Sequence, residues 1–257
     1  MNRPLSVVII ANNASRHIGE VIGAARRVSD DIIVLDSGSE DNTPEIARDM
    51  GARVVFQDWL GYSATKNVGN SMAQHDMILS LDADEVLSEE LIDHILIEDF
   101  NEETIYILDR ANYYCGRRIR FCHWNPDRIP RIFDRRKARW QGEFVHEKLK
   151  FHPSYSQKLL KGKLLHYSYD SYAQRLRKVK DYAILSARDR FRKGKRTTLP
   201  AMIVLPFFKF WITYIIHLGI LDGRAGLEIA WTDALGSWKR NRVLYDLQRN
   251  LTPECCK

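Results

Sequence analysis

Short apolar runs of strand length alternate with helix-like segments through the first hundred residues, and this alternation constrains the fold more than any other feature. The expected strands are Leu5–Ala11, Ile32–Leu35, Arg53–Phe56 and Met77–Leu81. Between them, apolar residues recur at helical spacing. Strands that alternate with helices form a sheet that is mostly parallel and covered by helices on both faces. The sequence therefore predicts an α/β domain.

The helix boundaries carry their own signals. Ser15 is expected to cap the first helix, and Ser88 is expected to start the fourth. Thr43 and Pro44 match the N-cap and first position of the second helix, which Gly51 closes. The third helix is expected over residues 63–73.

Polar side chains follow the expected strands at the points where these strands end. Asn12 follows the first strand, Asp36 ends the second, and Asp82 and Asp84 follow the fourth. In open α/β sheets, ligands bind beyond the carboxyl ends of the strands. An acidic residue such as Asp36 can accept hydrogen bonds from a ribose or a base, although a turn-forming aspartate remains the alternative. No G-x-G-x-x-G follows the first strand, which argues against a dinucleotide-dependent dehydrogenase.

The sharpest motif is Leu81-Asp82-Ala83-Asp84-Glu85 at the end of a buried strand. Three carboxylates so close to a core are costly without a nearby cation. Oxygen ligands suit Mg²⁺ or Mn²⁺, which also bind diphosphate oxygens. The alternative is an acidic cluster that precedes a helix. A phosphatase with the motif DxDxT is a poor match, because Glu85 and Val86 follow Asp84.

The pattern changes after residue 104. Strands are expected at 105–108, 131–133 and 144–149, and helices at 172–191 and 225–248. The predicted organisation is one α/β domain over residues 1–168 and a helical region over residues 169–257. Four cysteines without paired spacing indicate neither a disulfide scaffold nor a metal finger.

Charge is distributed unevenly along the chain. Residues 1–109 hold 7 Lys and Arg against 21 Asp and Glu, whereas residues 110–196 hold 25 against 7. The basic block suits a phosphorylated substrate or an anionic membrane surface, and the alternative is a solvated, salt-bridged face. No recognisable nucleic-acid-binding module accompanies it, so nucleic acid is not an expected partner. No signal in the sequence indicates an oligomeric state.

The segment from Leu199 to Leu221 contains Lys209 as its only Asp, Glu, Lys or Arg. As an ideal helix it would extend about 34 Å, which is enough to cross a bilayer. Pro200, Pro206 and Lys209 argue against a simple span. We therefore expect an in-plane or re-entrant element beside a cationic helix, with a buried hairpin as the alternative.

Several stretches together resemble glycosyltransferase family 2, whose members adopt the fold called GT-A. The early stretches are VVIIANN, IIVLDSGSEDNT, GYSATKN and LSLDADE. Later motifs follow in the order typical of one branch, the bacterial lipopolysaccharide-core β-1,4-glucosyltransferases. The match runs from Ser6 to about Tyr245. His123 and Asn125 depart from that branch, where Gly and Tyr are expected. The later motifs are Gly116-Arg117-Arg118, Trp124-Asn125-Pro126-Asp127, Arg131-Ile132-Phe133, Val145-His146-Glu147, Leu165-His166-Tyr167-Ser168, Pro206-Phe207 and Leu221-Asp222-Gly223.

The resemblance implies an inverting, metal-assisted transfer of a sugar from a nucleotide sugar, with UDP-glucose as the expected donor. A single displacement needs a carboxylate base, for which Glu147 is favoured and Asp127 is the rival. The remaining candidates fall into three groups. The nucleotide-sugar residues are Asn12, Asp36, Lys66, Asn67 and Asp82; the ligands of the divalent metal (Mg²⁺ or Mn²⁺) are Asp84, Asp82 and His166; the acceptor or sugar contacts are Trp124, Arg131 and His146.

The resemblance also implies a lipid-linked or phosphorylated saccharide as acceptor, namely the lipopolysaccharide core, and a location at the cytoplasmic face of the bacterial inner membrane. Capsule, exopolysaccharide or protein acceptors are the alternatives. A further alternative is a catalytically silent scaffold that binds a nucleotide sugar. Such a scaffold would have no reason to keep Asp36, Asp82, Asp84 and Glu147 together.

Overall fold

The computed structural model describes residues 3–142 and 147–249, which divide into two compact units. The first unit comprises described residues of 1–111 and 126–166, and the second those of 112–125 and 167–257. The sequence placed the segment 112–125 in the first domain, whereas it groups with the second unit. The backbone N–H groups of Arg120 and Phe121 donate to the carboxylate of Asp222, at 3.1 and 2.9 Å. These bonds tie the segment to the helical part of the chain.

Four parallel strands form one part of the sheet in the first unit: β1 (Leu5–Ala11), β2 (Asp31–Asp36), β3 (Arg53–Phe56) and β4 (Met77–Asp82). They lie in the order β3-β2-β1-β4. All residues of β1 and β2 are buried, as expected for strands covered on both faces. The register pairs Ala11 with Asp36 and Ile10 with Asp82. The chain ends of β1, β2 and β4 therefore meet at one edge.

The sheet continues with antiparallel strands. Strand β8 (Arg128–Asp134) pairs with β4, and β6 (Thr104–Tyr114) pairs with β8. Strand β12 (Leu164–Tyr169) pairs with β5 (Glu85–Leu87), which brings His166 opposite Glu85. The strands β9 and β10 form a separate hairpin. The shorter strands are β7 (Arg117–Arg118), β9 (Ala138–Gln141), β10 (Lys148–Phe151) and β11 (Ser156–Leu159).

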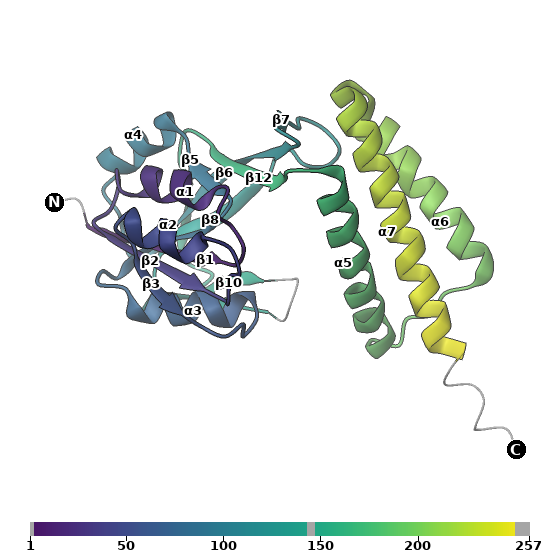
Figure 1. Ribbon diagram of the computed structural model, residues 1–257, viewed down its shortest axis with the longest axis horizontal. Coiled ribbons are helices and arrows are strands. Elements are labelled where there is room, and N and C mark those ends of the chain that lie inside the picture. The colour runs from purple at the N-terminus through teal and green to yellow at the C-terminus, as the bar shows by residue number, and fades with distance from the viewer. Residues whose placement is uncertain (1–2, 143–146, 250–257) are drawn as a thin grey trace, which may run out of the picture. The chain divides into compact units, whose positions relative to one another are not determined.

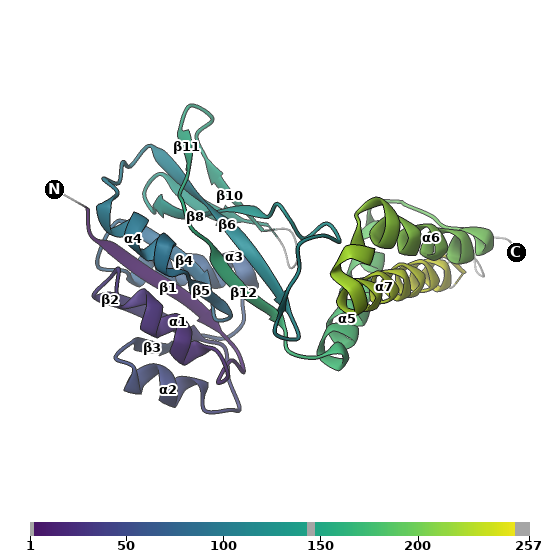
Figure 2. The same cartoon turned by 90° about the horizontal axis from the view of Figure 1, so that it is seen from above.

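Helices cover both faces of the parallel strands. Figure 2 shows α1 and α2 on one face and α3 on the other, as right-handed crossovers require when the strand order reverses. At Gly69 of α3, an added Cβ would lie 2.4 Å from Val8 and 2.7 Å from Leu35, so this helix packs closely on the sheet. The helices are α1 (Ile18–Ala25), α2 (Thr43–Asp49), α3 (Tyr62–Met72) and α4 (Glu89–Ile97).

The helix caps agree with the sequence in part. Ser88 caps α4 as predicted, because its side chain accepts from the N–H of Leu91. The prediction for Ser15 is wrong: α1 begins at Ile18, after His17. Thr43 is already helical, so the N-cap of α2 lies one residue earlier than predicted. Both residues are instead engaged by the loops at the strand ends.

The second unit is helical. It contains α5 (Tyr172–Arg192), α6 (Leu199–Trp211) and α7 (Gly223–Arg249), with α5 and α6 both packed against α7 (Figure 1). The chain from Leu199 to Leu221 is not one helix. After α6 it continues as a π-helical turn (η1, Ile212–Ile216) and then a 3-10 turn (η2, Gly219–Asp222). Leu218 between these turns has φ +53°, which breaks the helix there.

Candidate active site

The loops that follow β1 and β2 are joined by side-chain hydrogen bonds. Asn12 donates from Nδ2 to the carbonyl oxygen of Ser37 at 2.9 Å, and the N–H of Ser15 donates to Asp41 at 3.1 Å. Burial alone would raise the pKa of Asp41, but hydrogen bonds from Thr43 and Ser15 outweigh it and lower the pKa to about 2. The two loops are therefore held as one rigid rim at the strand ends.

Asp36 lies within this rim and is 5% exposed. Its carboxylate accepts from the N–H groups of Gly38 and Ser39, both at 3.1 Å, and from the Ser39 hydroxyl at 2.5 Å. These are the contacts of a turn-forming aspartate, the alternative that the sequence left open. A role in binding a nucleoside remains a proposal.

Acidic and basic side chains alternate in one continuous series of ion pairs in the first unit, which we call the ion-pair chain. Lys66 Nζ lies 2.8 Å from Glu147 and 3.0 Å from Asp82. Arg131 then lies 2.8 Å from Asp82 and 2.6 Å from Glu85. Beyond Glu85 the chain continues through Arg110, 3.2 Å away, to Asp127, which lies 2.8 Å from Arg110. The members of the ion-pair chain, in order, are Glu147, Lys66, Asp82, Arg131, Glu85, Arg110 and Asp127. The two candidates for the catalytic base, Glu147 and Asp127, lie at its ends.

Three inner members of this ion-pair chain are buried, whereas Asp82, whose side chain is 26% exposed, is as open as the two ends. The side chains of Glu85, Lys66 and Arg131 are 0, 1 and 4% exposed, whereas those of Glu147 and Asp127 are 26 and 24% exposed. Burial alone would raise the pKa of Asp82, yet the charges of Lys66 and Arg131 hold that pKa far below its usual range. Asp82 therefore stays ionised in the folded protein.

Glu85 is the member of the ion-pair chain whose loss we expect to cost the most stability. It binds both Arg131 and Arg110, and it also accepts from the N–H of Asp82 at 3.1 Å. Glu85→Gln should lower the free energy of unfolding by about 3–5 kcal/mol, because removing one partner leaves buried charges uncompensated.

Urea unfolding measures this effect, and Glu89→Gln is the matched control. Glu89 pairs with Arg27, but its side chain is 78% exposed, so its loss should change the midpoint little. Equal midpoints for the two variants would contradict the view that the buried chain stabilises the fold.

Asp84, two residues after Asp82, faces a histidine. Its Oδ2 atom lies 3.5 Å from Nε2 of His166 on β12. Among residues 3–142 and 147–249, no group of three or more His, Cys, Asp or Glu side chains is arranged to hold a metal ion. Mg²⁺, however, commonly takes one or two carboxylates and completes its shell with substrate phosphates and water. Asp84 with His166 fits that mode, whereas both oxygens of Asp82 already face cations of the chain.

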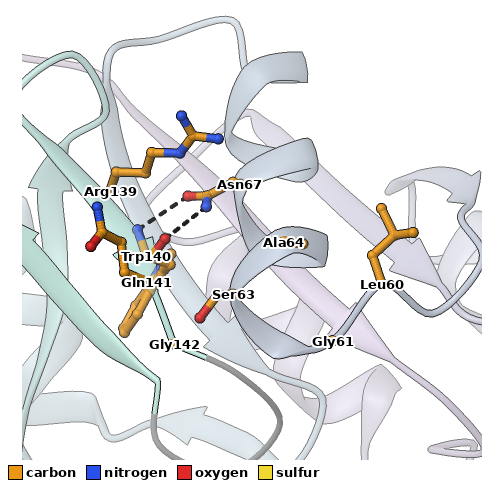
Figure 3. Close-up of a pocket in the computed structure, with 9 residues that line it drawn as sticks. All are labelled: Leu60, Gly61, Ser63, Ala64, Asn67, Arg139, Trp140, Gln141 and Gly142. Atoms are coloured by element: carbon orange, nitrogen blue, oxygen red, sulfur yellow. Dashed lines mark hydrogen bonds between the residues drawn. The ribbon is translucent and has the colours of Figure 1, made fainter.

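Asn67 supports the neighbouring hairpin. Its side-chain amide donates to the carbonyl oxygen of Trp140 at 2.9 Å and accepts from the N–H of Trp140 at 3.1 Å, which Figure 3 shows as paired dashed lines. The Trp140 ring in turn lies 4.8 Å from Nζ of Lys66. Asn67 thus fixes the aromatic wall beside Lys66. It also lines a pocket of about 390 Å³ between α3 and β9, together with Leu60, Gly61, Ser63, Ala64, Arg139, Trp140, Gln141 and Gly142.

The residues predicted to contact the acceptor lie in different environments. Arg131 is buried and serves the ion-pair chain. Trp124 belongs to the second unit, where the guanidinium of Arg175 lies 5.1 Å from its ring. His146 lies outside the residues that the structure describes.

The sequence analysis did not predict the ion pairs that two residues of this site make. Glu85 was seen as one of three crowded carboxylates, and Arg110 was not singled out. The only available signal was the cost of three carboxylates beside a core. Three crowded carboxylates indicate that positive charge is needed nearby. They do not distinguish a metal ion from arginine side chains of the protein as its source.

Comparison with known proteins bears on what such a site does. The family model described as glycosyl transferase family 2 matches residues 6–163, which is more than half of the chain and includes the ends of β1, β2 and β4. The chain belongs to glycosyl transferase family 2. Both the family and the α/β fold class predicted from the sequence are confirmed.

Relatives within the family span nearly the whole chain. An uncharacterized glycosyltransferase of Rickettsia conorii is 30% identical over 87% of this chain and 84% of its own length. A lipopolysaccharide core biosynthesis glycosyltransferase of Rhizobium meliloti is 26% identical over 93% of this chain and 94% of its own length. A crystal structure of glucosyl-3-phosphoglycerate synthase from Mycobacterium tuberculosis is 25% identical over 43% of this chain and 44% of that chain, with a TM-score of 0.35. That score is too low to support an argument about the site.

Proposed function

We propose that this family 2 glycosyltransferase transfers a hexose, with UDP-glucose as the expected donor, to a lipid-linked saccharide of the bacterial envelope, with inversion at the anomeric carbon. The observation that carries the proposal is Lys66, which joins Asp82 of the DxD motif to Glu147 at 3.0 and 2.8 Å. One buried cation thus places a candidate base next to the motif expected to bind the donor. The Rhizobium meliloti relative supports the lipopolysaccharide core as the acceptor class.

The donor side of the site consists of the DxD turn and the loop rim. Asp84 and His166 would hold a divalent metal ion, which supplies charge stabilisation to the leaving diphosphate when bound. Asp82 pairs with Lys66 and Arg131 and so holds both cations close to the proposed metal site. Asn12 and Asp36 lie at the ends of the neighbouring strands, where the nucleoside would bind.

Glu147 is the better candidate for the base. Its Oε1 atom faces Lys66, while its buried Oε2 atom accepts no hydrogen bond from the described residues. An unsatisfied oxygen of this kind would accept the proton of an acceptor hydroxyl once the acceptor reaches it. Asp127 is bound more tightly within its own loop, because Arg110 donates to both its carboxylate and its backbone carbonyl at 2.8 Å.

The reaction follows as a single displacement. Glu147 takes the proton from the acceptor hydroxyl, and the hydroxyl oxygen bonds to the anomeric carbon as the bond to the nucleoside diphosphate breaks. The bond electrons leave with the diphosphate, and Lys66 keeps the carboxylate of Glu147 in place beforehand. No covalent bond between sugar and enzyme is formed.

This scheme predicts the stereochemistry of the product. A donor with an α-linked sugar should give a β-linked product, because attack and departure occur on opposite faces of the anomeric carbon. NMR coupling constants of the isolated product measure the anomer. A retained α configuration would rule out the single displacement.

We propose the cytoplasmic face of the inner membrane as the place of action. The segment Leu199–Ile216 is apolar enough to enter a membrane, and only 6% of it is buried within the structure. The sequence had left a buried hairpin as the alternative, but large apolar side chains of this segment are exposed, Phe207 by 60% and Trp211 by 44%. A lipid-linked acceptor would also be found at such a surface.

Other acceptors remain candidates within the same scheme. Capsule and exopolysaccharide intermediates, or a protein, would use the same donor site and base. A screen of acceptors with one fixed donor separates them, since only the true acceptor class should increase release of the nucleoside diphosphate above the rate of donor hydrolysis. A silent scaffold would show no release with any acceptor.

A further inference from the structure

The outward face of α6 and the π-helical turn η1 is apolar over its whole length. Most of its exposed side chains recur at helical spacing and form one stripe, and Leu205, 45% exposed, lies beside it. In a helix at the surface of a globular protein, this outward stripe is normally polar. We call this stripe the apolar face; its members are Leu199, Ile203, Val204, Phe207, Phe208, Trp211, Ile212, Ile215 and Ile216, which are 39–75% exposed.

The opposite side of α6 makes polar contacts within the helical unit. Near the middle of the segment, Lys209 lies 3.7 Å from Asp233 of α7, and Thr213 donates to the same carboxylate at 3.3 Å. Asp233 also pairs with the buried Arg175 of α5, at 2.7 Å. If α6 crossed a bilayer, this charged cluster would lie near the bilayer centre, where ionised groups are costly. A helix that lies in the membrane plane leaves the cluster on the protein side.

Basic residues stand directly before the apolar face. The last residue of α5, Arg192, and the loop that leads into α6 are basic and exposed, with Lys193, Lys195 and Arg196 in the loop; α6 begins three residues after Arg196. The start of α6 is fixed in place, because Thr197 exchanges two hydrogen bonds with Gln248 of α7, at 2.7 and 3.0 Å. A basic cluster beside an apolar helix is typical of attraction to anionic lipids.

We infer that the apolar face inserts into the interfacial layer of an anionic membrane, with α6 parallel to the membrane plane and residues 192–196 on the lipid phosphates. The inference rests on the proposed membrane location and identifies the surface responsible. Positive charge next to the apolar face favours lipid over a protein partner, because both parts then meet a matching environment: acyl chains for the aromatic side chains and phosphates for the cations.

Vesicle co-sedimentation of the full chain tests the inference. The protein should bind phosphatidylcholine vesicles that contain phosphatidylglycerol, bind much less to phosphatidylcholine alone, and lose part of its binding at high salt. Exchanging Phe207, Phe208 and Trp211 for Ser should lower the partition coefficient roughly tenfold or more. Exchanging Arg192, Lys193, Lys195 and Arg196 for Gln should remove the preference for the anionic vesicles.

A matched control uses exposed apolar residues of the first unit. Phe56, Leu96 and Ile97 are 66, 49 and 79% exposed, and their exchange for Ser should leave vesicle binding unchanged. Transfer to a short soluble acceptor should be equal in the parent and in all three variants, so a failure of the proposed function is recognised separately. Circular dichroism verifies that each variant is folded.

Two outcomes would overturn the inference. The first is undiminished vesicle binding by the variant in which the apolar face is changed. The second is a parent protein that does not bind vesicles but forms a dimer, while the same variant is a monomer. The apolar face would then be a contact between copies of the chain.

Discussion

Asp84→Asn should reduce sugar transfer roughly 10³-fold or more, because the leaving diphosphate loses the metal ion that offsets its charge. Asp84 faces His166 at 3.5 Å and its side chain is 31% exposed, so an exchange that keeps its size should leave the fold stable. Turnover at saturating donor and acceptor, measured over a range of Mn²⁺ concentrations, gives the effect. His166→Gln should raise the Mn²⁺ concentration needed for half-maximal rate.

Glu90→Gln is the control for this prediction. Glu90 is an exposed carboxylate in the first turn of α4, six residues further along, and its exchange should not change the rate. Metal-independent turnover by Asp84→Asn at the parent rate, with EDTA present, would remove the metal from the account.

Glu147→Gln should lower kcat by roughly 10²–10⁴, since it keeps the size of the side chain but removes the proton acceptor. Donor affinity should change little, because Lys66 would still be paired with Asp82 at 3.0 Å. Single-turnover kinetics measure the chemical step, and isothermal titration with the nucleotide sugar measures donor binding.

Asp127→Asn is the comparison variant, because Asp127 stands at the other end of the same chain and is exposed to a similar degree, 24% against 26%. It should keep most of its activity. If Asp127→Asn loses the chemical step while Glu147→Gln keeps it, the roles of the two residues are exchanged.

The fold of the first unit was largely predictable because its signals are local. Continuous apolar runs marked β1, β2 and β4, and an aspartate at the end of β2 and of β4 marked the ligand edge. Helix ends were less certain: Ser15 has the character of a cap, but its N–H binds Asp41, a residue of another loop. Such a tertiary contact leaves no local pattern in the sequence.

The ion-pair chain was beyond prediction for the same reason. Lys66 and Glu147 are far apart in the sequence, as are Asp82 and Arg131, and only the sheet brings them together. The crowded DADE motif indicated a need for positive charge, which the sequence analysis assigned to a metal ion. The structure shows that Lys66, Arg131 and Arg110 pair with Asp82 and Glu85 of this motif, whereas a metal ion at Asp84 is a proposal.

The helical unit illustrates a different limit. Composition predicted an apolar element over Leu199–Leu221, but it did not predict the π-helical turn after Trp211 or the break at Leu218, where φ is +53°. Hydrophobicity alone also could not tell a buried helix from an exposed one. Exposure of Phe207 and Trp211 decided between these alternatives.

Release of UDP from UDP-glucose is the most direct test of the central claim that Asp84, the ion-pair chain and Glu147 form a sugar-transfer site. The purified protein should release UDP in the presence of Mn²⁺ and a lipid-linked core saccharide, and this release should stop when EDTA is added. The variants Asp84→Asn and Glu147→Gln should not release UDP under the same conditions. Equal UDP release by the parent and by both variants would contradict the account.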